Sequence, residues 1–267
     1  MHRPTLVRGT TGALAAVVGL LPWLLTGGHL PPQRLWFGDP GSPPFSLLPL
    51  SQEHVADVVG LHVTAGALAG LSLRLQRGRW PGRPVPATAA GMLLVQGIAA
   101  ASSLVTVRAG LPQRDASTVY LAALVALLLG ALVAGTVVLA LTAARSRALA
   151  VPGFALAALL VPGRGEHWWW PAVLVGVVIA WSGLRSAAQV TAAVVALALL
   201  WLVPTVETVL DNSVGNWVLL RFPADLVGTA VDVFRQRVTS TALVVPPLAV
   251  AAAVGLGGSL VSARVRR

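Results

Sequence analysis

Long stretches of apolar residues, almost free of charged side chains, constrain this sequence more than any other feature. A helix needs roughly 20 apolar residues to cross the hydrocarbon core of a bilayer, which is about 30 Å thick. Eight stretches meet or approach this length, and they run over residues 12–30, 55–73, 87–107, 119–141, 148–161, 169–184, 187–206 and 241–263. The sequence therefore predicts an all-α fold: a polytopic helical membrane bundle of about eight transmembrane helices, forming one integral membrane domain over residues 1–267.

The fifth and sixth stretches are the shortest, and they allow more than one arrangement. Pro152-Gly153 and Pro162-Gly163 flank the fifth stretch, and a Trp168-Trp169-Trp170 run beside charged residues opens the sixth. Tryptophan beside charge is typical of a membrane interface. The pair could cross a thin region of bilayer, cross with a tilt, or form a re-entrant hairpin. We favour two crossings.

Composition removes several classes of protein. Charged residues make up 10% of the chain, whereas a soluble domain carries about 25%. The chain has no lysine and no cysteine, which excludes a Walker A phosphate loop, a Schiff-base lysine, disulfides and thiolate metal sites. No Gly-x-Ser-x-Gly nucleophile motif is present either. The sequence therefore contains no nucleotide motif and no nucleophile motif.

The 19 arginines predict the orientation of the chain. If the N-terminus is cytoplasmic, 12 arginines and no acidic residue fall on the cytoplasmic side, while 7 arginines and all nine acidic residues fall outside. The positive-inside rule then places both termini in the cytoplasm. The composition of the chain, rich in Ala, Gly, Val, Arg and Pro, suggests a bacterium. We therefore expect a multi-pass protein of the plasma (inner) membrane. Its net charge of +10 would face the anionic inner leaflet of the lipid bilayer rather than nucleic acid.

The N-terminal stretch is expected to remain as an uncleaved signal anchor. Arg3 and Arg8 precede it, as in a signal peptide, but Pro22 and Trp23 interrupt it and no Ala-x-Ala site follows.

Two long outer segments, at about 31–54 and 207–240, are the expected places for contact with a partner. The first is rich in proline turns, and Trp36 and Phe45 would dock it on the membrane surface. In the second, Pro223 begins a helix whose apolar residues, Leu226 and Phe234 among them, recur at helical spacing. This pattern predicts an interfacial amphipathic helix on the outer face.

Few polar residues lie inside the apolar stretches, and His62 is the most informative of them. Counted from Ser51, which we expect to cap the second helix, His62 would lie about 16 Å along it, near the midplane. His62 shares a face with Gly66 and Gly70, whose spacing allows close helix packing. We expect a ligand or proton contact formed by His62, Gln96, Ser103 and Asp57. The alternative is a neutral imidazole that bonds a carbonyl of a neighbouring helix or Gln96.

A metal site on the outer side is the second candidate. Glu53 and Asp57 lie one helical turn apart, His54 flanks them, and His167 falls on the same side of the membrane. Carboxylates and imidazoles could together hold a divalent cation. The alternative is a set of first-turn residues that favour the helix dipole.

Three functions remain open on this basis. The first is a non-catalytic subunit or scaffold of a membrane or envelope complex, which would bind a membrane protein partner subunit. The second is a transporter or permease component that uses a groove near His62. The third is an outer-leaflet enzyme, metal-dependent or acid/base. The missing motifs and the sparse intramembrane polarity favour the first and argue against an enzyme. No cofactor is indicated, and haem held by two histidines is not expected because only His62 lies deep.

Overall fold

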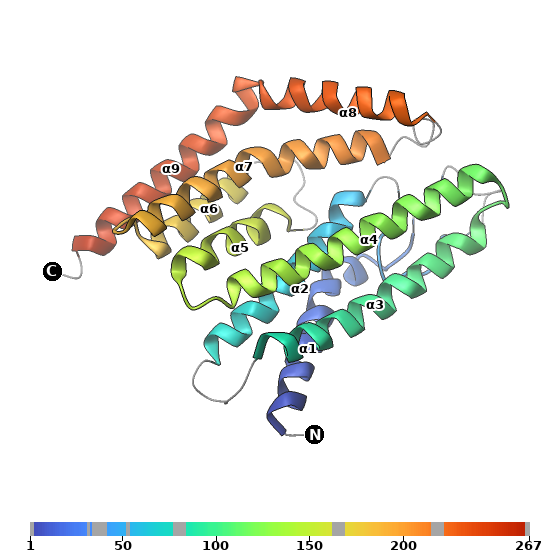
Figure 1. Ribbon diagram of the computed structural model, residues 1–267, viewed down its shortest axis with the longest axis horizontal. Coiled ribbons are helices and arrows are strands. Elements are labelled where there is room, and N and C mark those ends of the chain that lie inside the picture. Colours follow the sequence, from blue (N-terminus) through green and yellow to red (C-terminus); the bar gives the residue numbers. More distant parts are fainter. Residues whose placement is uncertain are drawn as a thin grey trace.

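The computed structural model describes residues 3–30, 33, 42–51, 54–76, 84–161, 169–214 and 222–264. Within these residues the chain is helical, and apart from one backbone bridge between His29 and Phe45 it forms no β-structure. The helices are α1 (Arg3–Leu25), α2 (Val55–Leu75), α3 (Pro84–Gly110), α4 (Asp115–Thr142), α5 (Arg147–Leu159), α6 (Trp169–Ser182), α7 (Ala187–Val214), α8 (Pro223–Val238) and α9 (Thr241–Arg264). The predicted all-α fold is confirmed (Figure 1).

Among the described residues, six helices are long and apolar enough to cross a bilayer. They are Thr5–Leu25, Val55–Leu75, Val85–Gly110, Asp115–Thr142, Ala187–Asn212 and Thr241–Val261. The remaining two apolar stretches form α5 and α6, of 13 and 14 residues. At 1.5 Å per residue these two helices are only about 20 Å long, shorter than the hydrocarbon core.

Helices α1–α4 form one half of the bundle, held by very close backbone approaches. α2 packs along α4, and α1 packs along α3 and α2. A Cβ built on Gly66 of α2 would overlap the carbonyl oxygen of Gly135 on α4, and one on Gly12 of α1 would overlap that of Thr88 on α3. Small residues at such crossings let the backbones of membrane helices pack directly. The expected packing role of Gly66 is therefore seen in the structure.

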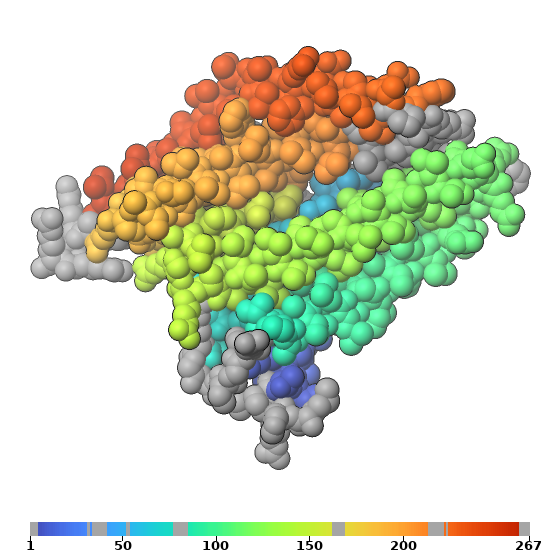
Figure 2. Space-filling view, in the orientation of Figure 1, coloured from blue at the N-terminus to red at the C-terminus, as the bar shows by residue number. Residues whose placement is uncertain are grey.

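Helices α5, α6, α7 and α9 form the other half around a second cluster of buried residues. α6 packs along α9 and α5 along α7, and the cluster includes Val151, Val175, Ile179 and Ala196. A smaller cluster, which contains Val63, Val138 and Leu160, joins the two halves. In Figure 2, α4 runs across the visible face where the α1–α4 half borders the other half. α8 and α9 form one edge of the molecule.

The second long connecting segment, predicted at about 207–240, is more helical than the sequence predicts. α7 does not end near Val206 but continues through Pro204 to Val214, and α8 packs along it. Arg237 of α8 donates from Nε and Nη2 to the Thr208 hydroxyl on α7, at 3.2 and 3.0 Å. This contact with α8 gives the end of α7 a tertiary partner that hydropathy alone does not reveal. The helix predicted to begin at Pro223 is present.

Among the described residues, one end of the bundle holds arginines and no acidic residue, whereas the acidic residues lie toward the other end together with Arg108, Arg114, Arg235 and Arg237. We call one end the basic end: it holds the start of α1, the end of α2, the α4–α5 and α6–α7 connections and the end of α9, which lie along the lower left of Figure 1. Its described charged residues are arginines: Arg8, Arg74, Arg145, Arg147 and Arg185. The opposite end holds the α3–α4 connection and the end of α7, and the described acidic residues lie toward it: Asp57, Asp115, Glu207, Asp211, Asp225 and Asp232.

Candidate functional site

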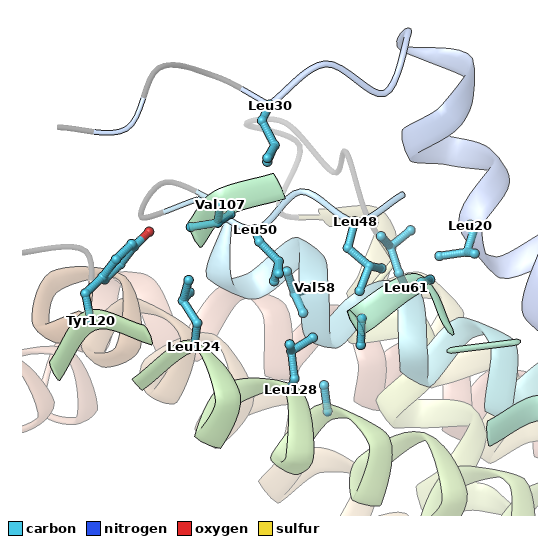
Figure 3. Close-up of a cluster of buried hydrophobic side chains, with 13 residues drawn as sticks. Leu20, Leu30, Leu48, Leu50, Val58, Leu61, Val107, Tyr120, Leu124 and Leu128 are labelled. Atoms are coloured by element: carbon cyan, nitrogen blue, oxygen red, sulfur yellow. The ribbon is translucent and has the colours of Figure 1, made fainter. Parts of the chain in front are cut away.

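At the end opposite the basic end, segments that flank α1 and α2 cover the α1–α4 half. Leu30, Leu48 and Leu50, which flank α1 and α2, have no exposed surface. They enter a cluster with Val58 and Leu61 of α2, Val107 of α3, and Tyr120, Leu124 and Leu128 of α4, as Figure 3 shows. We call Leu30 and residues 42–51 the plug. It covers the ends of three helices with apolar side chains and is part of the core.

Hydrogen bonds fix the plug to the helices around it. Trp23 Nε1 donates to the Ser46 carbonyl at 2.9 Å, and the Leu48 amide donates to Ser103 Oγ at 2.9 Å. The Tyr120 hydroxyl donates to Gln33 Oε1 at 2.7 Å, and Gln33 Nε2 donates to the Leu50 carbonyl. These bonds satisfy backbone groups that burial removes from water. The sequence predicts Ser103 at a ligand or proton contact. In the structure its hydroxyl oxygen accepts a hydrogen bond from the Leu48 amide.

A glycine turn brings the plug back onto α1. Gly27 and Gly28 have φ of 102° and 62°, a left-handed backbone that glycine adopts without steric cost. Ser46 N then donates to the Gly28 carbonyl at 2.8 Å. The first apolar stretch, expected to reach residue 30, therefore stops being helical at Leu25.

His62 and Gln96 are both buried within the bundle. His62 is fully buried and its Nδ1 bonds the Val58 carbonyl, one turn back along α2, at 2.7 Å. His62 Nε2 and Gln96 Oε1 have no hydrogen-bond partner among the described residues. This bond differs from the alternative considered for His62, a carbonyl of a neighbouring helix, because the acceptor lies in α2 itself. Because α2 begins at Val55, His62 lies only about 10 Å along it, not 16 Å.

The start of α2 differs from the expected cap and holds part of the metal candidate. His54, not Ser51, is the N-cap residue. The Ser51 hydroxyl instead bonds His54 Nδ1 at 2.8 Å, and the His54 ring meets Trp23 edge to face. Asp57 is half-buried in the first turn of α2. Glu53 and His167 lie outside the described residues, within which no three His, Asp or Glu side chains group to hold a metal.

The residues expected to dock a partner lie on the plug and on α8. Phe45 is 57% exposed and Phe234 is 37% exposed, while Leu226 is half-buried. Leu226 shares its face of α8 with Arg237, which bonds α7, so this side of the helix lies against α7. Trp36 lies outside the described residues.

A cation–aromatic cluster at the basic end has no counterpart in the sequence prediction. The guanidinium carbons of Arg74 (end of α2) and Arg147 (start of α5) lie 4.8 and 5.4 Å from the ring centroid of Trp181 on α6. Arg74 Nη1 donates to the Ala144 carbonyl at 2.8 Å and Arg147 Nη1 to that of Trp181 at 3.2 Å. Phe154 packs edge-on to Trp181. In the sequence, Arg74, Arg147 and Trp181 share one feature: each lies at or near the end of an apolar stretch, and these ends are predicted to lie on the same side of the membrane.

Trp181 is held in place by a well-formed turn between α6 and α7. Gly183 ends α6 with a φ of 78°, and its amide bonds the Ile179 carbonyl. Ser186 and Gln189 cap α7 reciprocally: Gln189 N donates to Ser186 Oγ, and Ser186 N donates to Gln189 Oε1. Such a capping box satisfies amides that the helix itself leaves unpaired. Hydrogen bonds from backbone and side chains therefore fix the connection beside the cluster.

A comparison of the chain with protein-family models, with curated proteins and with solved structures finds no match in any of the three.

Proposed function

We propose that the chain is a multi-pass protein of the plasma membrane of a bacterium, with its basic end and both termini in the cytoplasm. Large apolar side chains on the long helices are exposed, such as Leu94, Val105 and Leu129 at 65, 68 and 59%. Exposed apolar surface of this extent suits lipid rather than water. Among the described residues, the basic end holds arginines and no acidic residue, and this excess of positive charge supports the orientation by the positive-inside rule.

We further propose eight membrane segments: the six long helices and the pair α5–α6. The α4–α5 and α6–α7 connections lie at the same end of the bundle (Figure 1), so the pair enters and leaves the membrane on one side. The tip of the pair could reach the outer surface or stop within the bilayer. In both cases the two termini of the chain lie on the side that we propose.

The activity we propose is that of a non-catalytic subunit of a membrane or envelope complex. One observation carries it: α8 presents two apolar faces, and α7 covers only one of them. Leu226, Ala230, Val233 and Arg237 are half-buried on the α7 side, whereas Val227, Val231 and Phe234 form an exposed stripe at 59, 40 and 37%. The packing against α7 holds this stripe on the surface of the bundle, away from the basic end. A membrane protein partner would bury it beside the outer leaflet.

Glutamates in this stripe should separate the protein from its partner. We expect Val231→Glu with Phe234→Glu to lower the amount of co-purified subunit about tenfold or more, because the interface would bury unpaired charge. Native mass spectrometry of the gently solubilised protein from its own host measures the ratio of subunits. The matched control is Gln236→Glu, which is exposed on the opposite, polar face of α8.

Two outcomes would contradict the subunit proposal. One is a wild-type protein that carries no second subunit; the other is an equal loss of partner in the control. A bare monomer or homo-oligomer would favour the second candidate, a self-contained transporter. The observation behind that candidate is the pair of buried polar atoms without partners among the described residues, His62 Nε2 and Gln96 Oε1, within the helices of the α1–α4 half.

A further inference from the structure

We propose that the partner subunit carries an Asp or Glu side chain at the edge of its own apolar face, and that this carboxylate pairs with Arg235 beside the exposed stripe of α8. This inference rests on the proposed function, because it names the chemistry of the partner that covers Val227, Val231 and Phe234. It adds an ion pair to the interface, with its basic member on this chain.

Arg235 borders the stripe along α8. Val231 lies one helical turn before Arg235, and Phe234 directly precedes it. Residues four apart on a helix are surface neighbours, and all three of these side chains are exposed. The stripe from Val227 to Phe234 is about 10 Å long at 1.5 Å per residue, so a partner segment that covers it also reaches the guanidinium group.

The Arg235 side chain forms no hydrogen bond or ion pair within the described part of the chain. Arg237, two residues later, differs because it lies on the α7 side and donates to the Thr208 hydroxyl. Asp232 lies almost one turn before Arg235 and is also described, but no ion pair joins the two side chains. The guanidinium group of Arg235 therefore faces outward beside the stripe.

Burial of the stripe would remove water from this guanidinium group. An arginine that loses water without gaining an acceptor weakens an interface, because a charge without a partner is costly to bury. Two donors in the fork of an arginine match the two oxygens of a carboxylate. Complementary charge also speeds the encounter of two proteins and selects between partners. An acidic side chain is therefore the counterpart that this surface requires.

The surface has room for a partner on the Arg235 side of the stripe. Gly228 lies two turns before Arg235 on the same face of α8 and is exposed. A Cβ built on Gly228 would meet no atom of the described residues within 4 Å. A small residue with open space beside it lets another chain approach closely. The partner can therefore pack here, whereas α7 covers the opposite side of the stripe.

A cross-link from a single lysine tests the ion pair. The chain has no lysine, so Arg235→Lys supplies its only side-chain amine, which a carbodiimide joins to a carboxylate in contact with it. We expect carbodiimide treatment of membranes from the host to link this variant to the subunit, as measured by mass spectrometry of the product. Gln236→Lys, exposed on the polar face of α8, should give about fivefold less product, because successive residues point about 100° apart on a helix.

Charge reversal provides the second readout. Arg235→Glu should lower the amount of co-purified subunit about tenfold, because two like charges would then meet in the interface. The matched control is Arg114→Glu, which makes the same change of charge at an exposed position on the α3–α4 connection and should retain the subunit like the wild type. Native mass spectrometry of the gently solubilised protein measures both variants.

Three results would overturn this inference while the proposed function stands. One is a subunit that stays bound to Arg235→Glu but is lost from Val231→Glu with Phe234→Glu. Another is an equal yield of cross-linked product from Arg235→Lys and Gln236→Lys. The third is no product from Arg235→Lys, which would mean that Arg235 meets a group other than a carboxylate, such as a lipid phosphate. A wild-type protein without a second subunit would overturn both proposals.

Discussion

Adding one methyl group at Gly66 is expected to lower the thermal stability of the protein by roughly 10 °C, corresponding to about 3 kcal/mol or more. The new Cβ would overlap the Gly135 carbonyl oxygen and lie 2.9 Å from its carbonyl carbon. Both obstacles are backbone atoms, so no rotamer change relieves the clash and the α2–α4 crossing must open. Thermal unfolding of Gly66→Ala in detergent, followed by loss of monodisperse protein, measures the effect.

Two other glycines provide the matched control for this substitution. A Cβ added to Gly97 on α3 or to Gly130 on α4 would meet no atom of the described residues within 4 Å, so alanine fits there and also favours the helix. Gly97→Ala and Gly130→Ala should therefore unfold within about 2 °C of the wild type. If all three variants behave alike, the close crossing of α2 and α4 is wrong.

Shortening Leu48 should be nearly as damaging, because it empties the centre of the plug. Leu48 is fully buried against the cluster around Tyr120 and Leu124, and removing a buried leucine side chain costs about 2–5 kcal/mol. We expect Leu48→Ala to lower the unfolding temperature by roughly 10 °C. Thermal unfolding in the same detergent measures it.

The control for the plug is Leu25→Ala, whose side chain is 81% exposed at the end of α1. It should change the unfolding temperature little, because an exposed leucine leaves no cavity. Equal stability of Leu48→Ala and Leu25→Ala would show that the segment lies on the surface, as its prolines alone suggest, and not in the core.

The sequence predicts the long helices well because hydropathy alone decides them. Each of the six long apolar stretches is a helix, since an apolar run of this length with almost no charge satisfies its backbone groups within a helix. Boundaries are less predictable, because local and tertiary effects decide them. Two left-handed glycines follow the end of α1 at Leu25, and α7 continues to Val214 with α8 packed along it.

The candidate sites are less predictable because they depend on contacts between distant segments. Burial of His62 follows from its place in an apolar stretch, but its bond to Val58 does not. Gln33, which also bonds the plug at Leu50, pairs with Tyr120, 87 residues away, and no periodicity reveals that pairing. The cluster of Arg74, Arg147 and Trp181 likewise requires three helices to be placed in space.

Labelling of single cysteines at the two ends of α4 tests the central claim, that the chain crosses the membrane with its basic end in the cytoplasm. The natural chain has no cysteine, so the wild type should take up no label. Gln113 and Ser146 are exposed on the connections before and after α4. We predict that a membrane-impermeant maleimide labels Gln113→Cys in intact cells and labels Ser146→Cys only after the membrane is permeabilised. Labelling of Ser146→Cys in intact cells would contradict the account, whether or not Gln113→Cys is labelled with it.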